Sequence, residues 1–236
     1  VSGGTVELGH SVDNVGGELT ALGNLTIERG IAASETGYLN NQEGKISVGG
    51  DFIAPYVHKF NNSQGRISAG GTMKVEAHQF DNHDGVIGGK TVGVKTREFY
   101  KTQYQVVQDL LSNIGGLIRA EEALTLDAWV LDNRHTQTSD PSRPLGLVGK
   151  TVTINTGNDA SNKHQDRRLN HFNNTQGAVA AEKGLKLTTR MLVNYSGRVS
   201  SLGSADIKGE YVHNEPAPSS QEPGQIGAGD RLSMET

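Results

Sequence analysis

The sequence predicts an all-β fold, a right-handed parallel β-helix of about nine coils, and three observations support this prediction. First, one phrase recurs nine times: an apolar residue, any residue, Asn, two residues, Gly, one residue and an aliphatic residue. Second, the period of the phrase is about twenty residues where nothing is inserted, which is typical of a solenoid repeat. Third, most phrases are followed by apolar residues that alternate with period two, and this period indicates strands.

The first element of each unit is a short strand that ends at the recurring Asn. The residue two positions before Asn is aliphatic or aromatic in every unit, and we expect this column to face inward: Val12, Leu39, Phe60, Phe80, Leu111, Leu131, Phe172, Leu192 and Val212. The Asn residues would stack as an amide ladder, because a buried amide needs hydrogen-bond partners: Asn14, Asn41, Asn62, Asn82, Asn113, Asn133, Asn174, Asn194 and Asn214. The Asn or Asp that precedes most of them is typical of a side-chain-capped turn.

A corner follows at the Gly three residues after Asn, because Gly adopts the positive φ angles that turns require. In two units an insertion intervenes, and we assign the corner there to Gly146 and Gly224. Two residues after the Gly, a second short strand contributes a column dominated by β-branched residues: Leu19, Ile46, Ile67, Ile87, Ile118, Val148, Val179, Val199 and Ile226.

A second turn, often Gly-Gly, leads to the third element, a strand with inward residues at alternate positions. These pairs are Leu25 and Ile27, Met73 and Val75, Val92 and Val94, Leu124 and Leu126, Val152 and Ile154, Leu185 and Leu187, and Leu232 and Met234. Short strands separated by corners close about one turn, so successive coils stack with parallel strands about 4.8 Å apart. The handedness of parallel crossovers predicts right-handed winding.

Composition narrows the function classes. A net charge of -4 with mixed signs gives no reason to expect nucleic acid or an anionic membrane as the main partner. The absence of Cys excludes disulfides and thiolate metal sites. No apolar run approaches the roughly 20 residues of a membrane helix, so we expect no membrane insertion. We expect one monomeric β-helical segment over residues 1–236, a piece of a longer array, because Val1 to Gly4 resembles the middle of a repeat.

Catalytic and metal chemistry is not indicated. The eight His residues show no metal-ligand spacing, and His58 and His78 share one repeat column. We therefore predict no metal, no cofactor and no enzymatic activity. The alternative is a β-helix that binds or degrades polysaccharide, because acids such as Asp81, Asp132, Glu76 and Asp127 could meet the required carboxylate separation on adjacent coils. Asp81 and Asp132, however, already occupy the turn position.

Five insertions interrupt the repeat, at residues 28–38, 95–110, 134–145, 155–171 and 215–223, and they leave from only two corners of the coil. Within residues 97–111, apolar residues at helical spacing (Tyr100, Tyr104, Val107 and Leu111) predict a short amphipathic helix. Packing against the rod is the simplest interpretation of this helix, and partner contact is the alternative.

A contact surface is the sharpest site hypothesis. Lys163, Arg167 and Arg168 form a basic cluster in one insertion, while Arg134 and Arg143 come from another on the same coil. With Tyr100 and Tyr104 they would form a surface for a sulfated glycan or an acidic lipopolysaccharide. The alternative is that these are solvated loops.

Two units carry a family resemblance, Phe60-Asn61-Asn62-Ser63-Gln64-Gly65-Arg66-Ile67-Ser68-Ala69-Gly70-Gly71 and Phe80-Asp81-Asn82-His83-Asp84-Gly85-Val86-Ile87. They resemble the haemagglutinin repeats of filamentous haemagglutinin and of contact-dependent growth inhibition exoproteins. The resemblance implies a filament or stalk segment of a virulence-associated adhesin or toxin-delivery protein, secreted to the cell surface of a Gram-negative bacterium. It also implies export by an outer-membrane two-partner-secretion transporter that acts on the parent protein, and a target-cell surface protein or glycan as partner.

Overall fold

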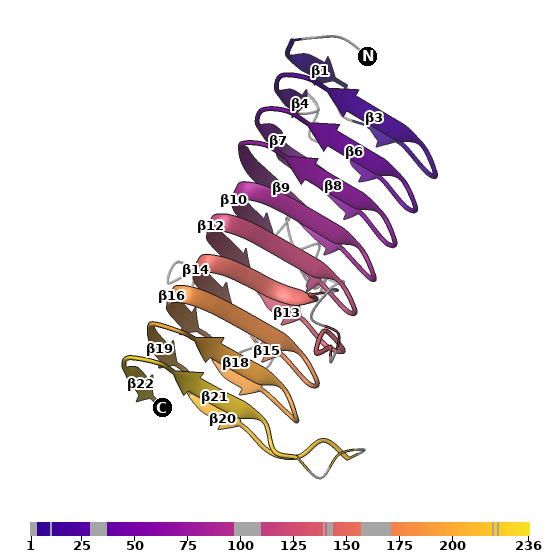
Figure 1. Ribbon diagram of the computed structural model, residues 1–236. Helices are drawn as coiled ribbons and strands as arrows, with labels where there is room; N and C mark the ends of the chain where they lie inside the picture. The colour runs from indigo at the N-terminus through magenta and orange to yellow at the C-terminus, as the bar shows by residue number, and fades with distance from the viewer. Residues whose placement is uncertain are drawn as a thin grey trace, which may run out of the picture.

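The computed structural model is a rod of stacked β-coils (Figure 1). It describes residues 4–9, 11–28, 37–96, 110–138, 140, 144–156, 171–218, 220 and 222–236. Within these ranges there is no helix, and the strands pair in parallel from coil to coil. The prediction of an all-β parallel β-helix is therefore confirmed, while its right-handed winding stays a prediction from the crossover rule.

Each coil has three faces, and we number the coils 1 to 9 by their Asn, from Asn14 to Asn214. Face A holds β2 (Val12–Asp13), β5 (Tyr38–Asn40), β11 (Leu110–Ser112), β13 (Val130–Asp132), β15 (His171–Asn173), β17 (Met191–Val193) and β20 (Tyr211–His213). Face B holds β3 (Glu18–Ala21), β6 (Lys45–Val48), β8 (Arg66–Ala69), β18 (Arg198–Ser201) and β21 (Gln225–Ala228). Face C holds β1 (Val6–Leu8), β4 (Leu25–Ile27), β19 (Ser204–Lys208) and β22 (Leu232–Glu235).

Six longer strands pass from one face to the next. β7 (Phe52–Asn61) and β9 (Thr72–Asp81) run from face C to face A, whereas β10 (Val86–Thr96), β12 (Leu117–Ala128), β14 (Gly146–Thr156) and β16 (Ala178–Thr188) run from face B to face C. Their pairings shift register at the corner, as between Gly89 and Thr91 in β10. Ala54 and Val57 flank a similar shift in β7. These irregularities turn the chain without ending the strand.

The inward column of face A follows the predicted register through all nine coils. The paired residues are Val12, Leu39, Phe60, Phe80, Leu111, Leu131, Phe172, Leu192 and Val212. The seven central members are at most 1% exposed. Phe60 and Phe80 stack with ring centroids 4.5 Å apart and planes 6° from parallel. This packing confirms the column as core.

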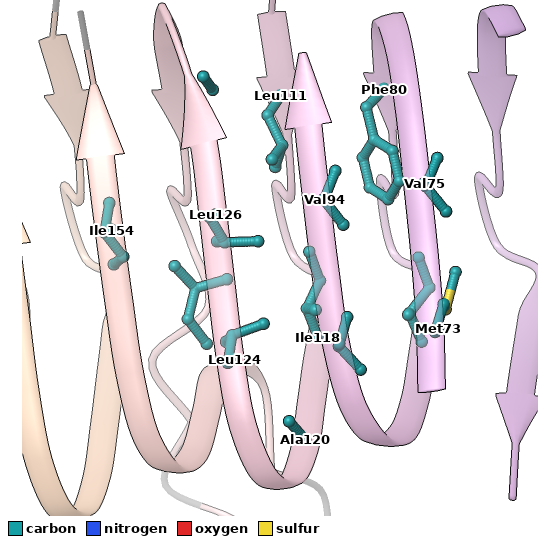
Figure 2. Close-up of a cluster of buried hydrophobic side chains, with 14 of the residues drawn as sticks. Met73, Val75, Phe80, Val94, Leu111, Ile118, Ala120, Leu124, Leu126 and Ile154 are labelled. Atoms are coloured by element: carbon teal, nitrogen blue, oxygen red, sulfur yellow. The ribbon is translucent and has the colours of Figure 1, made fainter. Parts of the chain in front are cut away.

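Face C supplies the rest of the narrow core through two parallel columns. One runs through Met73, Val92 and Leu124, and the other through Val75, Val94 and Leu126. Figure 2 shows members of both columns, among them Met73, Leu124 and Val94, in one cluster with Phe80 and Leu111 of face A and Ile118 of face B. Phe52 with Ala54 and Ala205 with Ile207 extend the same columns, although the alternation analysis did not include these pairs.

The predicted Asn ladder is present and unbroken. In each coil the Asn Nδ2 donates to Oδ1 of the next Asn at 2.6–2.8 Å, from Asn14 to Asn214. In most coils the same Nδ2 also donates to the carbonyl oxygen of the corner Gly, as Asn62 does to Gly65 at 3.2 Å. Seven of these amides are fully buried, so the ladder satisfies polar groups inside the rod.

The prediction that the corner Gly is needed for a positive φ angle is wrong. The corner Gly, for example Gly65, does not have a positive φ; the residue before it does, and Gln64 has φ 57°. Glu43, Asp84, Gln176 and Ser196 likewise precede a corner Gly and have φ between 50° and 56°, and His135, with φ 57°, precedes Thr136. At Gly65 a Cβ would collide with the carbonyl oxygen of Asn41 in the preceding coil. Close approach between coils therefore requires this Gly.

Coil 6 departs from two further expectations. Leu147, not Val148, pairs with Ile118 and Val179 in the inward column of face B, and Val148 faces outward. Gly146 pairs with Leu117 as a strand residue at φ 94°, so it is not the counterpart of the corner Gly. Thr136, three residues after Asn133, occupies that position. The insertion after Thr136 shifted the sequence alignment by one residue.

The predicted amphipathic helix falls at residues 97–109, which lie outside the described residues. Its expected end is wrong: Leu110 and Leu111 belong to strand β11, where Leu111 pairs with Phe80 and Leu131. The apolar spacing that placed Leu111 on a helix comes instead from the inward column of face A.

Candidate functional site

Of the seven residues predicted to form a contact surface, the structure describes Arg134. Tyr100, Tyr104, Arg143, Lys163, Arg167 and Arg168 lie outside the described residues. Arg134 follows β13 at the corner between faces A and B. The hypothesis of one surface formed by both insertions therefore stays a prediction.

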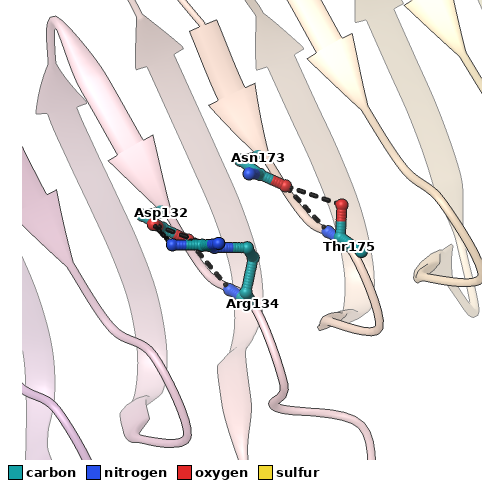
Figure 3. A network of polar contacts seen from close by, with 4 residues as sticks. All are labelled: Asp132, Arg134, Asn173 and Thr175. Atoms are coloured by element: carbon teal, nitrogen blue, oxygen red, sulfur yellow. Dashed lines mark hydrogen bonds and ion pairs between the residues drawn. The ribbon is translucent and has the colours of Figure 1, made fainter. Parts of the chain in front are cut away.

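Arg134 is engaged by Asp132 within its own turn (Figure 3). Its Nε lies 2.9 Å from Asp132 Oδ1 and its Nη2 lies 2.8 Å from Oδ2, while its backbone N–H donates to Oδ1. The hydrogen bond to Asp132 and the carboxylate charge raise the pKa of Arg134 against the effect of burial. In the next coil, Asn173 Oδ1 accepts from the backbone N–H and the hydroxyl of Thr175. Arg134 thus replaces that hydroxyl in a capped turn, and its charge is largely compensated.

His58 and His78 lie opposite each other on β7 and β9, with ring centroids 5.2 Å apart. The Tyr56 ring meets His78 edge-on at 6.2 Å. Partial burial and the neighbouring His78 lower the pKa of His58 below its ordinary value. No group of three or more His, Asp or Glu that could hold a metal ion occurs within the described part of the chain.

The acids considered for glycoside hydrolysis are distributed over two faces. Asp81 and Asp132 lie on face A, where each Oδ1 accepts the backbone N–H two residues later. Asp127 lies on face C and pairs with Lys95 at 3.2 Å. Glu76 also lies on face C, with Nζ of Lys74 at 3.9 Å. On face A, Ser112 pairs in register with both Asp81 and Asp132 and lies between them. On face C, Lys95 pairs in register with both Glu76 and Asp127, so a cation lies between these two acids.

The hydroxyl of Thr136 supplies the hydrogen-bond acceptor that is missing from the corner where the insertion at 134–145 begins. In other coils a backbone carbonyl of the corner Gly accepts the N–H of the coil below, as Gly65 does from Val86 at 2.9 Å. In coil 6 the Thr136 hydroxyl accepts the N–H of Ala178 at 2.9 Å and donates to the carbonyl of Asn133 at 3.0 Å. The side chain is fully buried. The insertion therefore leaves the rod without exposing an unpaired backbone group.

A groove of about 900 Å³ runs along the outside of face B beside this insertion. Its floor is an outward column of paired residues on successive coils, Val148, Ala180 and Ser200, with Ala178 beside it. One wall is the insertion itself, with Thr136, Gln137, Thr138, Pro144 and Leu145. The opposite rim, at the corner of faces B and C, carries Glu121, Lys150, Glu182 and the exposed Leu202. The floor side chains are short, and at the position of Ala178 the early coils carry the charged residues Glu18, Lys45 and Arg66.

Two arginines line the groove, Arg119 on coil 5, where the groove begins, and Arg198 on coil 8, one coil before it ends at residues 225–229. Arg119 pairs with Val148 in the outward column, and Arg198 pairs with Ala178. Both side chains are exposed, and no ion pair or side-chain hydrogen bond of either occurs within the described residues. The side chain of Arg66 on coil 3 is also exposed, but it lies outside the groove.

Sequence reasoning did not identify this groove. The signal was the outward position of the face B strands, which changes from Lys45 and Arg66 in early coils to Ala178 in coil 7. The misplacement of Val148 in the inward column hid the most apolar floor residue. The insertion that forms the wall was recognised from the sequence. It was considered as a candidate site because of its basic residues, not because of the residues that form the wall.

No family model matches the chain, and neither the curated proteins nor the solved structures include a match. Among the described residues there is no helix long and apolar enough to cross a membrane.

Proposed function

We propose that this chain is a rigid spacer segment of a secreted bacterial surface exoprotein, either an adhesin or a contact-dependent toxin-delivery protein. The observation that carries the proposal is the Asn ladder, which is unbroken through nine coils although five insertions interrupt the repeat. A rod that keeps its register while loops leave its corners is suited to extend a molecule and to display those loops.

The parent protein supplies the cellular context in this proposal. It is exported through an outer-membrane two-partner-secretion transporter and remains at the surface of a Gram-negative cell. The resemblance of the Phe60 to Gly71 unit to haemagglutinin repeats supports this context, and the absence of Cys is compatible with it. The insertions at the corners are then the parts that meet a target-cell protein or glycan.

Localisation on the producing bacterium tests the proposal. Antibodies raised against this chain should label the outer surface of intact cells in immunoelectron microscopy, at a distance from the outer membrane. Labelling should disappear when the transporter gene is deleted. Labelling only in the cytosol of permeabilised cells would refute the proposal.

Polysaccharide binding or degradation is the competing function, because the groove on face B is an elongated surface concavity. Incubation with a panel of acidic and neutral polysaccharides distinguishes it. We expect no release of reducing ends, and a release that Glu121→Gln or Glu182→Gln abolishes would favour the competing function.

A further inference from the structure

The outer surface of face B differs between the ends and the middle of the rod. Its first outward column begins with Glu18, Lys45 and Arg66 and continues, after four coils with Val86, Leu117, Gly146 and Ala178, to Arg198. Figure 1 shows the corresponding strands β10, β12, β14 and β16 side by side along one flank. An isolated solvated face would be expected to keep polar side chains throughout. Leu117 within this stretch is buried, and Ala178 is the member that lines the groove, beside Val148 and Ala180 of the neighbouring outward column.

We propose that the groove on face B binds an extended polypeptide segment with a carboxylate near each end and an apolar side chain between them. The apolar side chain would lie over Val148, Ala178 and Ala180. The carboxylates would pair with Arg119 and Arg198. The proposal concerns a surface and does not depend on the role of the chain as a spacer.

The charged lining of the groove is mixed, with Arg119, Arg198 and Lys150 against Glu121 and Glu182, so the positions of the two arginines rather than the net charge support this ligand. Arg119 and Arg198 are three coils apart along the rod axis, about 14 Å at the spacing of parallel strands, and two residues apart across the face, about 7 Å. An extended chain advances about 3.4 Å per residue, so carboxylates at positions i and i+4 match the axial separation and point to the same side, and the long arginine side chains span the offset across the face. A side chain at i+2 also points to that side, toward the apolar floor.

The floor favours polypeptide over glycan. Sugar recognition relies on many hydrogen bonds and on aromatic rings, and this floor offers Val148, Ala178 and Ala180 with one hydroxyl, that of Ser200. Aromatic side chains are absent from the described lining of the groove. An apolar floor that lies between two guanidinium groups instead fits a segment in which an aliphatic side chain lies between two acidic ones.

Titration of the isotopically labelled chain with defined peptides tests the proposal. The probes are four acetylated, amidated heptapeptides, Thr-Asp-Thr-Val-Thr-Asp-Thr and its versions with Leu, Ile or Phe at the centre, measured by NMR at pH 7 and low salt. We expect at least one probe to shift the amide signals of Val148, Ala178 and Ala180. Replacing both Asp of the probe by Asn should weaken binding about tenfold, the product of two exposed ion pairs.

Matched variants locate the site. Arg119→Gln and Arg198→Gln should each weaken binding about threefold. Arg66→Gln removes a similar exposed guanidinium outside the groove and should change nothing. Ala180→Glu places a bulky anion on the exposed floor and should abolish binding. Unchanged melting temperatures show that these surface variants fold.

Three results would overturn the proposal: no amide shifts with any probe, shifts that the Asn versions reproduce in full, or binding that Arg119→Gln and Arg198→Gln leave unchanged. A fourth would replace it. If oligosaccharides of heparin or polygalacturonate, and not the peptides, gave shifts that depend on Arg119 and Arg198, the groove would bind an acidic glycan.

Discussion

At the scale of single residues, the two positions that close each Asn turn have opposite requirements. Gln64 holds a left-handed backbone at φ 57°, which costs an L-residue about 1–2 kcal/mol, whereas Gly65 has an ordinary φ but no room for a Cβ. The sequence shows the Gly in nearly every unit, but it does not show which of the two positions is left-handed. Only the stacked coils reveal the neighbouring Asn carbonyl that excludes a side chain.

Substitutions at this pair should therefore have opposite signs. We expect Gln64→Gly to raise the free energy of unfolding by about 0.5–1 kcal/mol, because Gly relieves the left-handed strain at some entropic cost. Gly65→Ala should lower it by about 2–3 kcal/mol, because the methyl group forces the coils apart. Urea unfolding of both variants measures the difference. Equal destabilisation by the two substitutions would contradict the assignment.

Thr136 is a second residue whose role depends on one side chain. We expect Thr136→Ala to lower the free energy of unfolding by about 1–3 kcal/mol, because it leaves the N–H of Ala178 without its acceptor. Thr136→Ser keeps the hydroxyl and should retain most of the stability. Thermal unfolding of the two variants is the measurement. If Ser were as harmful as Ala, the lost methyl group rather than the hydroxyl would be responsible.

His58 gives the fold a weak dependence on pH. Burial and the nearby His78 lower the pKa of His58 in the folded chain below the value of about 6.5 that it has when unfolded. As pH falls through about 6.5, the unfolded chain binds this proton first, so stability should decrease between that pH and the lower folded pKa. NMR titration of the imidazole should give a midpoint below 6.5. His58→Gln should reduce the loss of stability on acidification, and a midpoint above 6.5 would exclude the mechanism.

At the scale of an element, the Asn ladder shows what the sequence predicted well and where it failed. The ladder and the face A column repeat in every unit, so periodicity alone predicted both, including the register across insertions. The prediction failed in coil 6, where the repeat pattern is replaced. There the Thr136 hydroxyl takes the place of a Gly carbonyl as acceptor, and Leu147 rather than Val148 is the inward residue. The groove was missed for a related reason, because its floor consists of outward residues that follow no repeat.

Substitutions at two neighbouring residues of one coil, Asn61 and Asn62, distinguish the stability that the buried Asn ladder contributes from that of the half-exposed turn. Asn62→Ala should lower the free energy of unfolding by about 3 kcal/mol, because it leaves the buried amides of Asn41 and Asn82 each lacking a partner. Asn61→Ala removes the half-exposed bonds to Ser63 and Asn40 and should cost about 1 kcal/mol. Chemical unfolding of both variants tests this order. Comparable losses would mean that the ladder adds no more than an ordinary turn.

At the scale of the whole molecule, each coil contacts only its two neighbours, so the rod is a sum of similar interfaces. Whole coils should then be removable while parts of coils are not. Deleting residues 42–82 joins Asn41 to His83, removes two coils and keeps the Asn-x-x-Gly corner intact. Deleting residues 42–72 removes a non-integral number of coils and should abolish cooperative unfolding, because it exchanges inward and outward positions.

Small-angle scattering of the full chain and of the variant lacking residues 42–82 tests the stacked-coil rod most directly. The maximum dimension of the variant should be shorter by about 10 Å, the thickness of two strand spacings, with the cross-sectional radius of gyration unchanged. A variant that kept its length, or whose cross-section changed, would contradict a rod built from interchangeable coils.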